Sequence, residues 1–207
     1  MTDLKEKDLI RKAKQGDMHA FEELILKHEK IVYNLALRMM NHSEDAKDVS
    51  QEVFLKAYRS LSNFDERSAF STWIYRITHN TCIDEMRKRK GKQNYSLEEE
   101  LENEEGSMQR QIADEGDTPE ESLLREEQKS EILQALDSLS EEHKAAIVLR
   151  DVKGLSYEEI AEILEVSLGT GISRISRARI QLKNEILKMR EQNEKTVRHK
   201  KGKEGRP

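Results

Sequence analysis

The chain has 207 residues, of which 37% are charged and 35% are hydrophobic, so any hydrophobic core must be small. It contains no run of eighteen apolar residues and begins with the charged segment MTDLKEKDLIRK, which argues against a membrane span and a signal peptide and favours the cytoplasm. The single cysteine, Cys82, excludes an internal disulfide, and the two prolines and scarce alternating runs predict an all-α protein.

The net charge of −5 argues on its own against a nucleic-acid ligand. However, the acidic residues are concentrated between Leu97 and Glu127, where thirteen of them stand against two arginines. The rest of the chain carries a net charge of +6, and its basic residues cluster at 87–92, at 174–190 and after Lys195. This segregation places basic clusters on predicted helices, as in nucleic-acid-binding proteins.

Residues 5–41 read as two helices, which Gly16 and Asp17 separate, and Asp17 is positioned to cap the second helix. Apolar residues at helical spacing predict that this second helix packs against the segment that follows, with no chemistry of its own. The inward-facing residues are Phe21, Leu24, Ile25, His28, Ile31, Leu35 and Met39.

The segment from Asp45 to Lys90 has the strongest pattern in the chain. A helix is expected over its first half, since Ala46, Val49, Val53, Ala57 and Leu61 form an apolar stripe. Asp48, Glu52, Leu55 and Arg59 share the opposite, exposed face. Residues 62–65 break the helix, and a second helix is expected from near Ser71, with Phe70, Trp73, Ile74 and Ile77 inward. Its basic end, 87–90, suits a helix C-terminus and a phosphate backbone.

The sequences DVSQEVFLKAYRSL and FDERSAFSTWIYRITHNTCIDEMRKR within this segment resemble region 2 of bacterial RNA polymerase sigma factors, in particular the small extracytoplasmic-function (ECF) group. In that family the first helix docks on the clamp helices of the polymerase β′ subunit, and the loop and second helix read and melt the promoter −10 element. The resemblance implies that core polymerase is bound by Asp48, Gln51, Glu52 and Leu55.

The same resemblance assigns −10 DNA contacts to residues of the loop and of the second helix. Phe64, Phe70 and Trp73 are expected to shape the site for flipped bases, although Trp73 also fits a core position. Asn80 and Asp84 are candidate readers of the −10 bases. Candidates for phosphate contacts are Arg76, Arg87, Lys88 and Arg89.

Residues 93–118 read as an acidic flexible linker, because repeated glutamates and two glycines cannot bury enough apolar surface to order it. In the resembling family the linker threads the polymerase near the active site and RNA exit. The sequence leaves open whether the segment does this or is a passive tether.

From Pro119 the pattern is helical again, with Ser140 positioned to cap a helix that carries Ile147, Val148 and Val152. Gly154 is expected to end that helix, and Ser156 with Glu159 forms a capping box for the next one. This next helix has inward-facing residues, and a short turn at 165–168 and a basic helix from Thr170 come after it. The order is that of a helix-turn-helix. The inward residues of the first helix are Ile160, Ile163 and Leu164, with the small Ala161 where a second helix could cross closely.

The stretch 154–179 resembles sigma region 4, which recognises the promoter −35 element and binds the polymerase β flap. Arg174 and Arg177, three residues apart, can contact bases or phosphates together, and Arg179 points to another face, where it suits a phosphate contact or a surface ion pair. The full set of −35 candidates is Tyr157, Glu158, Thr170, Ser173, Arg174, Arg177 and Arg179.

Two positions depart from the family pattern of Gly-Thr-Val-Lys-Ser-Arg: Gly171 stands in place of a buried valine and Ile172 in place of a lysine. Ser167 also stands where the family often has proline. Because position 171 lies four residues before Ile175 on the inward stripe, we expect an unfilled gap there and a frayed helix start. Replacing Gly171 by valine would then stabilise the fold.

The predicted organisation is two small helical domains, a region 2 bundle over 1–92 and a region 4 helix-turn-helix over 119–190, with the linker over 93–118 and a basic disordered tail over 191–207. The resemblance implies an alternative sigma factor whose partners are core RNA polymerase, promoter DNA and an anti-sigma factor. The rival is a free-standing helix-turn-helix regulator, which would bind DNA specifically without polymerase.

An enzymatic role is not expected. His79, Cys82 and Asp84 lie at i, i+3 and i+5 of one helix and spread over a wide arc, so they cannot converge on a substrate. One cysteine and scattered histidines give no metal-ligand spacing, and no phosphate-cradling glycine loop is present. No metal, cofactor or small-molecule substrate is therefore predicted.

Overall fold

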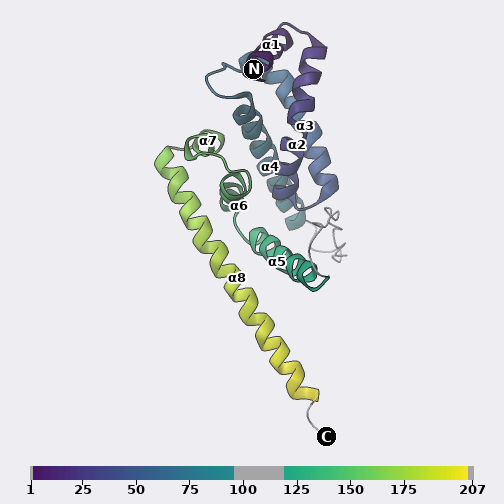
Figure 1. Cartoon of the computed structure of the whole chain (residues 1–207), viewed down its shortest axis with the longest axis vertical. Helices are drawn as coiled ribbons and strands as arrows, with labels where there is room; N and C mark the ends of the chain where they lie inside the picture. Colours follow the sequence, from purple (N-terminus) through teal and green to yellow (C-terminus); the bar gives the residue numbers. More distant parts are fainter. Residues whose placement is uncertain (1, 96–118, 205–207) are drawn as a thin grey trace.

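The computed structural model describes the backbone of residues 2–95 and 119–204, and the side chains of residues 4–89, 125 and 127–192. Every regular element in these residues is helical, as the sequence predicts (Figure 1). Within the described residues, no helix is both long enough and apolar enough to span a bilayer.

The N-terminal half consists of α1 (Thr2–Lys14), α2 (Met18–Met40), α3 (Ser43–Ser60), the 3-10 turn η1 (Leu61–Asn63) and α4 (Phe70–Tyr95). Asp17 caps α2 as predicted, since its carboxylate accepts a hydrogen bond from the backbone N–H of Ala20 at 3.1 Å. At the other end of α2, Asn41 adopts a left-handed conformation with φ of 57° and ends the helix.

The predicted apolar stripes form the core of this half. All five stripe residues of α3, from Ala46 to Leu61, are buried, and they pack with α2 and α4. On α2, Leu24, Leu35 and Met39 are almost fully buried, and His28 is buried against Phe70 with ring centroids 5.0 Å apart. This packing is what fixes the loop of residues 64–69 at one end of α4.

The C-terminal half begins with α5 (Pro119–Asp137) and α6 (Glu141–Ile147), which Ser140 caps through the N–H of His143 at 3.4 Å. A π-helical turn, η2 (Val148–Val152), follows α6. Shortly after it the chain passes through Gly154, whose φ of +71° is suited to glycine. The sequence did not predict this π turn. At its end Val152, one of the apolar residues of the predicted helix, is 47% exposed.

The helix-turn-helix consists of α7 (Tyr157–Ile163) and α8 (Leu168–Glu204). The predicted capping box is present: Ser156 Oγ accepts from the N–H of Glu159 at 3.1 Å, and the Glu159 carboxylate accepts from the N–H of Ser156 at 2.8 Å. Helix α8 begins two residues before the predicted Thr170, because Ser167 Oγ accepts the N–H of Thr170 at 3.2 Å and so caps it. The predicted fraying at this helix start is therefore wrong.

Position 171 is buried, as the stripe through Ile175 predicts, but the expected gap is absent. A β-carbon on Gly171 would meet the Cβ of Ala161 at 3.5 Å and its Cα at 3.7 Å. Helix α7 has moved close because both crossing residues are small, so the missing side chain leaves no cavity.

Helix α8 runs to Glu204 and α4 runs to Tyr95, so both helices extend beyond the domain ends predicted at residues 190 and 92. Most of the predicted acidic linker, residues 96–118, lies outside the described residues.

The two halves are not independent. Helix α4 packs against α7, and α2 packs against α6 and η2, so that one continuous core includes residues of both halves (Figure 1). From the C-terminal half this core takes Val148, Leu149, Ile160 and Ile163, all almost fully buried. The prediction of two domains held together only by a tether missed this interface.

Candidate nucleic-acid interface

A pocket of about 400 Å³ lies where the 64–69 loop meets the start of α4. It is partly open to solvent and is lined by aromatic, polar and charged side chains from the loop and from α4. One wall comes from the other half of the molecule, where Glu162 of α7 reaches the rim. The lining residues are Asn63, Phe64, Asp65, Arg67, Ser68, Trp73, Arg76 and Glu162.

Three aromatic rings support this pocket from below. Trp73 packs on Phe64 and Phe70 with ring centroids 5.1 and 5.3 Å apart, and the two phenylalanines meet edge to face at 5.6 Å. Phe64 and Trp73 also line the pocket, although they are only 3% and 6% exposed, and Phe70, at 2% exposure, belongs to the core beneath it. Two of the three predicted aromatic residues therefore border the pocket from core positions.

The remaining −10 candidates follow α4 away from the pocket. Arg76 lines it, Asn80 is exposed and donates to the carboxylate of Glu165 at 3.4 Å, and Asp84 is exposed with its carboxylate 4.0 Å from the ammonium of Lys56. Arg87 is exposed on the next turn, and Lys88 lies 3.5 Å from Glu85.

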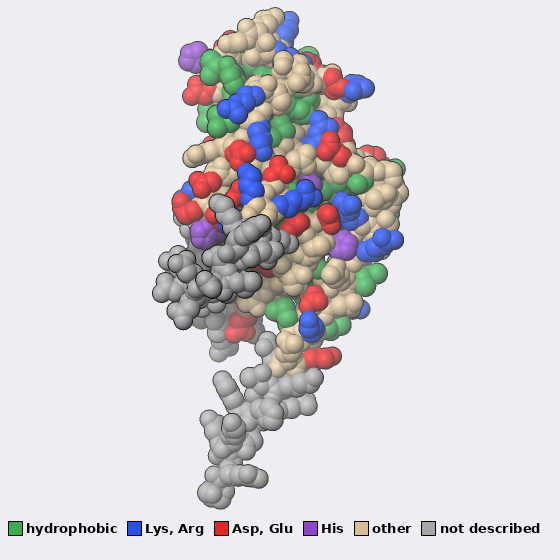
Figure 2. Space-filling model, turned by 180° about the vertical axis from the view of Figure 1, so that it is seen from behind, with side chains coloured by type: hydrophobic (Ala, Val, Ile, Leu, Met, Phe, Trp, Pro, Cys, Tyr) green, Lys and Arg blue, Asp and Glu red, His purple; other side chains and the backbone are tan. Residues whose placement is uncertain are grey.

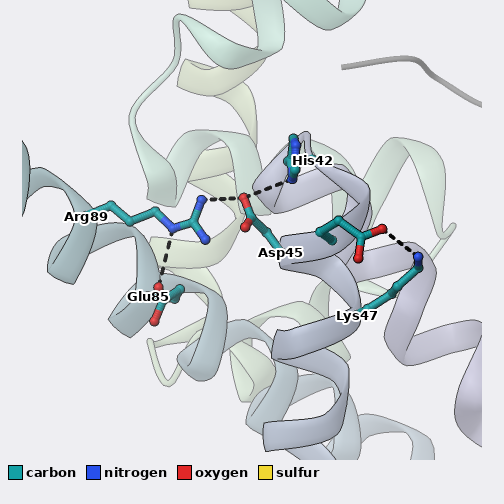
Figure 3. A network of polar contacts seen from close by, with 6 residues as sticks. His42, Asp45, Lys47, Glu85 and Arg89 are labelled. Carbon is teal, nitrogen blue, oxygen red and sulfur yellow. Dashed lines mark hydrogen bonds and ion pairs between the residues drawn. The ribbon is translucent and has the colours of Figure 1, made fainter. Parts of the chain in front are cut away.

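Arg89 differs from the other basic candidates because two carboxylates already hold it. Its guanidinium donates to Asp45 of α3 and, at 3.3 Å, to Glu85 one turn earlier on α4 (Figure 3). His42 lies 3.5 Å from the same Asp45 carboxylate. These contacts raise the pKa of Arg89, chiefly through the hydrogen bond to Asp45, and tie α3 to α4. A phosphate would have to compete with both carboxylates for this side chain.

The face of α3 opposite the core carries the predicted polymerase-binding residues. Asp48 and Gln51 are exposed, and Leu55 is 57% exposed, which is unusual for leucine. The carboxylate of Glu52 forms an ion pair with the ammonium of Lys56 at 2.9 Å, and the hydrogen bond between them lowers the pKa of Glu52. The structure therefore brings the four residues together on an accessible face, a geometry suited to docking.

The −35 candidates lie on α7 and the start of α8. Glu158, Thr170 and Arg177 are exposed, whereas Ser173 and Arg174 are half-buried. Tyr157 is half-buried under the guanidinium of Arg150, 4.3 Å from its ring centre. Arg179 forms a two-pronged ion pair with Asp151, the surface alternative expected for this residue.

Charges of both signs are mixed on the face drawn in Figure 2, where lysine and arginine side chains are interspersed with aspartate and glutamate instead of forming one large basic patch. Binding of nucleic acid on this face would therefore depend on local contacts more than on a long-range field.

The residues considered for an enzymatic site do not converge. His79 and Cys82 are buried and Asp84 is exposed on another face of α4. Burial raises the pKa of the Cys82 thiol to about 12, so it is not a nucleophile at neutral pH. Among the described residues, no group of three or more histidine, cysteine or acidic side chains is placed to hold a metal.

Sequence reasoning missed Glu162 and Glu165, the two acidic residues of the C-terminal half that reach the −10 candidates. No local pattern could have found them, because their position depends on how the halves pack. The loop residues Asn63, Asp65 and Arg67 had a signal in the polar break after η1, but it predicted a turn and not a pocket.

Comparisons with known proteins agree with this organisation. Residues 24–92 match the family described as Sigma-70 region 2, and residues 129–182 match Sigma-70, region 4. RNA polymerase sigma-H factor of Pseudomonas aeruginosa is 36% identical over 181 residues, which cover 86% of this chain and 92% of that protein. ECF RNA polymerase sigma factor SigW of Bacillus subtilis is also 36% identical over 181 residues, which cover 87% and 96% of the two chains.

Solved structures are similar over both halves. The sigma factor RpoE from Bartonella quintana, in complex with the anti-sigma factor NepR, superimposes with a TM-score of 0.62 and 27% identity, over 81% of this chain and 96% of that one. CnrH in complex with the cytosolic domain of CnrY gives a TM-score of 0.59 and 25% identity, over 87% and 96%. The sequence identities, taken over nearly the full length of the relatives, show that the chain belongs to the family of ECF RNA polymerase sigma factors.

Proposed function

We propose that this chain is an alternative sigma factor that binds core RNA polymerase, directs it to specific promoters through the −10 and −35 elements, and promotes strand opening. The observation that carries the proposal is the pocket at the start of α4, with Phe64 and Trp73 on its wall and Arg76 at its edge. An unstacked base needs an aromatic surface and its phosphate needs a cation. The pocket supplies the cation Arg76 and borders two aromatic side chains, Phe64 and Trp73, which are 3% and 6% exposed.

The exposed face of α3 is the proposed docking site for the β′ clamp helices. Leu55 supplies exposed apolar area at one end of this set, and Asp48, Gln51 and Glu52 add acidic and polar groups over the two preceding turns. Protein interfaces combine apolar and polar groups in this way. The −10 pocket and the α3 face lie on different elements, so one chain can hold polymerase and DNA together.

For the C-terminal half we propose that the start of α8 enters the major groove of the −35 element. Thr170, Ser173, Arg174 and Arg177 lie within its first three turns, where a recognition helix contacts bases. Tyr157 and Glu158 at the start of α7 are proposed to contact the neighbouring backbone or bases. Arg179, held by Asp151, would reach a phosphate only by exchanging this partner.

Several points rest on resemblance and are part of the proposal. The functional units are region 2 over 1–92 and region 4 over 119–190, and the acidic residues of 93–118 run through the polymerase or act as a tether. An anti-sigma factor is a proposed partner, because the similar RpoE is in complex with the anti-sigma factor NepR and the similar CnrH with the cytosolic domain of CnrY. Since the chain is proposed to act on core polymerase, its proposed location is the cytoplasm.

Run-off transcription with purified core polymerase on genomic fragments tests the proposal. Added chain should produce discrete transcripts that core enzyme alone does not make. Arg76→Ala should reduce strand opening without reducing co-purification with core polymerase, because Arg76 lies at the pocket and not on the α3 face. Arg11→Ala, which removes an exposed arginine of α1, is the matched control. An absence of transcripts from any fragment, with intact binding to core, would overturn the proposal.

A further inference from the structure

Lys14, the last residue of α1, holds the 64–69 loop beside the pocket. Its ammonium donates to the backbone carbonyl of Phe64 at 2.5 Å and to the Glu66 carboxylate at 3.0 Å, and it lies 5.5 Å from the centre of the Phe64 ring. The bonded residues are 50 and 52 positions from Lys14 in the sequence. A single side chain of α1 therefore binds the loop through its backbone, through a carboxylate and through an aromatic face.

The backbone that carries Lys14 is itself fixed in place. The preceding residue, Ala13, is buried in the core, and its carbonyl accepts the N–H of Gly16 at 3.0 Å in the turn that follows α1. Gly16 adopts a φ of +94°, the left-handed conformation with which glycine ends a helix. The side chain of Lys14 is only 24% exposed, so it reaches the loop from a fixed base.

Glu66, its carboxylate partner, has a backbone conformation that needs support from outside the loop. Its φ of 60° is left-handed, which a residue with a long side chain rarely adopts, and such a conformation persists only where the surroundings hold it. The Asp65 carboxylate accepts the N–H of Arg67 at 3.2 Å, but this bond lies inside the loop and cannot fix the loop against the helices. The contacts of Lys14 with Phe64 and Glu66 supply such an anchor.

The anchored residues stand next to residues that line the pocket. Asp65 and Arg67, on either side of Glu66, both line it, and so does Phe64, whose carbonyl Lys14 binds. A shift of the backbone at Glu66 would therefore move two charged side chains at the pocket.

We infer that Lys14 is a positioning residue for the −10 site, which keeps the 64–69 loop in the conformation that shapes the pocket and so determines how well the pocket discriminates among bases. This inference rests on the proposed function, because it assumes that the pocket takes an unstacked promoter base. Lys14 acts through the loop and not on DNA, because a carbonyl and a carboxylate already bind its ammonium. It lies outside residues 24–92, which match the region 2 family.

Three variants and a matched control test this role. Lys14→Met keeps a long unbranched side chain but removes the ammonium, whereas Lys14→Arg keeps a cation with several donors. Lys12→Met, the control, removes the same charge from the same helix, but Lys12 is exposed and pairs with Asp8 inside α1 at 2.8 Å. Glu66→Gln weakens the ion pair from the exposed side of the loop, and it decides the question should Lys14→Met lose helicity.

Trp73 reports the position of the loop in the free chain. It is the only tryptophan, it is 6% exposed, and its ring packs on that of Phe64 with centroids 5.1 Å apart. Acrylamide should quench its fluorescence roughly twofold more strongly in Lys14→Met, because the released loop opens more often. Glu66→Gln should show a smaller increase, and Lys12→Met and Lys14→Arg should match the wild type.

Strand opening by the holoenzyme is the second measurement, made with permanganate on a promoter that the chain transcribes and on single-base variants of its −10 element. Lys14→Met should open the promoter roughly tenfold more slowly, as expected for the loss of a charged hydrogen bond, and should discriminate less among the −10 bases. Its affinity for core polymerase should stay unchanged, and Lys14→Arg should restore most of the opening rate.

Wild-type quenching in Lys14→Met and Glu66→Gln would overturn the inference. Increased quenching with wild-type opening and base discrimination would do the same, since the loop would then move without consequence for the −10 site. An equal loss of core binding in Lys14→Met would assign the effect to the fold and also overturn it. A wild-type holoenzyme that opens no promoter would instead overturn the proposed function, and quenching in the free chain would still decide whether Lys14 holds the loop.

Discussion

Gly171 and Ala161 form the crossing point of the helix-turn-helix. A β-carbon on Gly171 would lie 3.5 Å from the Cβ of Ala161, which is ordinary van der Waals contact, and 3.9 Å from its backbone nitrogen. Glycine at position 171 thus lets α7 and α8 approach until a single β-carbon would reach contact with Ala161. The buried position predicted from the stripe is confirmed, and the predicted gap is wrong.

Replacing Gly171 by valine should therefore destabilise the chain. Two further methyl groups beyond the β-carbon have to push against Ala161, and overpacking of this kind costs about 1–3 kcal/mol. Gly171→Ala fits the space and should stabilise α8 by up to about 1 kcal/mol through its higher helix propensity. Urea unfolding of the full chain measures both changes. A valine variant more stable than the alanine variant would show that α7 gives way at this crossing.

Ile172 offers a test of DNA contact by the same helix. It is 44% exposed, so a longer cation at this position would reach out without disturbing the core. Ile172→Lys should add one phosphate contact and steepen the slope of log affinity against log salt by about 0.9. Leu187→Lys, at 48% exposure farther along α8, should leave the slope unchanged. Equal slopes for Ile172→Lys and the wild type would show that the start of α8 stays away from the DNA backbone.

Glu52→Arg should abolish co-purification with core polymerase while leaving the helical content unchanged. The change reverses a charge on the exposed α3 face and places an arginine beside Lys56, its present partner. Pull-down with tagged core enzyme and circular dichroism measure the two effects. Glu29→Arg, at an exposed position of α2, is the control for charge alone. Retained binding of the Glu52 variant would remove the docking assignment from this face.

His79 should make the packing of the N-terminal half against the C-terminal half sensitive to pH. It is buried against the C-terminal half, and burial lowers its pKa below the ordinary 6.5. Its hydrogen bond to Asn80 opposes the shift, Arg174 of α8 adds to it, and Glu165 and Glu142 weakly oppose it. His79 holds its proton less tightly when the two halves are packed together than it would if they were apart. The packing of the halves is therefore fully favoured above about pH 6.5 and weakens as the pH falls towards the lowered pKa of His79.

The expected result is a radius of gyration that grows between about pH 7.5 and about pH 5.5 in the wild type. His79→Gln should flatten this dependence. His28→Gln should preserve the pH dependence, since His28 is buried inside the N-terminal half and keeps its surroundings when the two halves separate. An equal pH response in the His79 variant would assign the effect to other groups.

The helices and most of their buried faces could be predicted from the sequence because the signals are local. The stripe from Ala46 to Leu61, the Asp17 cap and the Ser156–Glu159 capping box depend on spacing along one segment, and all three are confirmed. The resemblance also predicts binding residues on the α3 face and at the start of α8, and their roles stay predictions.

The contact between the halves could not be predicted, since it joins residues far apart in the chain. Lys144 and Met39 are separated by 105 positions and Asn80 and Glu165 by 85, and none of the four carries a local signal for its partner. The π turn at 148–152 had no sequence signature either, and it decides which way Val152 points. The position of Glu162 at the pocket could not be predicted either, because it depends on contacts between residues far apart in the chain.

Binding of promoter DNA by the free chain, compared with binding in the presence of core polymerase at physiological salt, tests the proposed function most directly. The free chain should bind poorly, because its net charge is −5. With core polymerase, binding should become specific for the −10 and −35 elements, and permanganate should detect unpaired thymines at −10. Tight, sequence-specific binding by the isolated chain, with no strand opening when core polymerase is added, would contradict the proposal and favour a free-standing helix-turn-helix regulator.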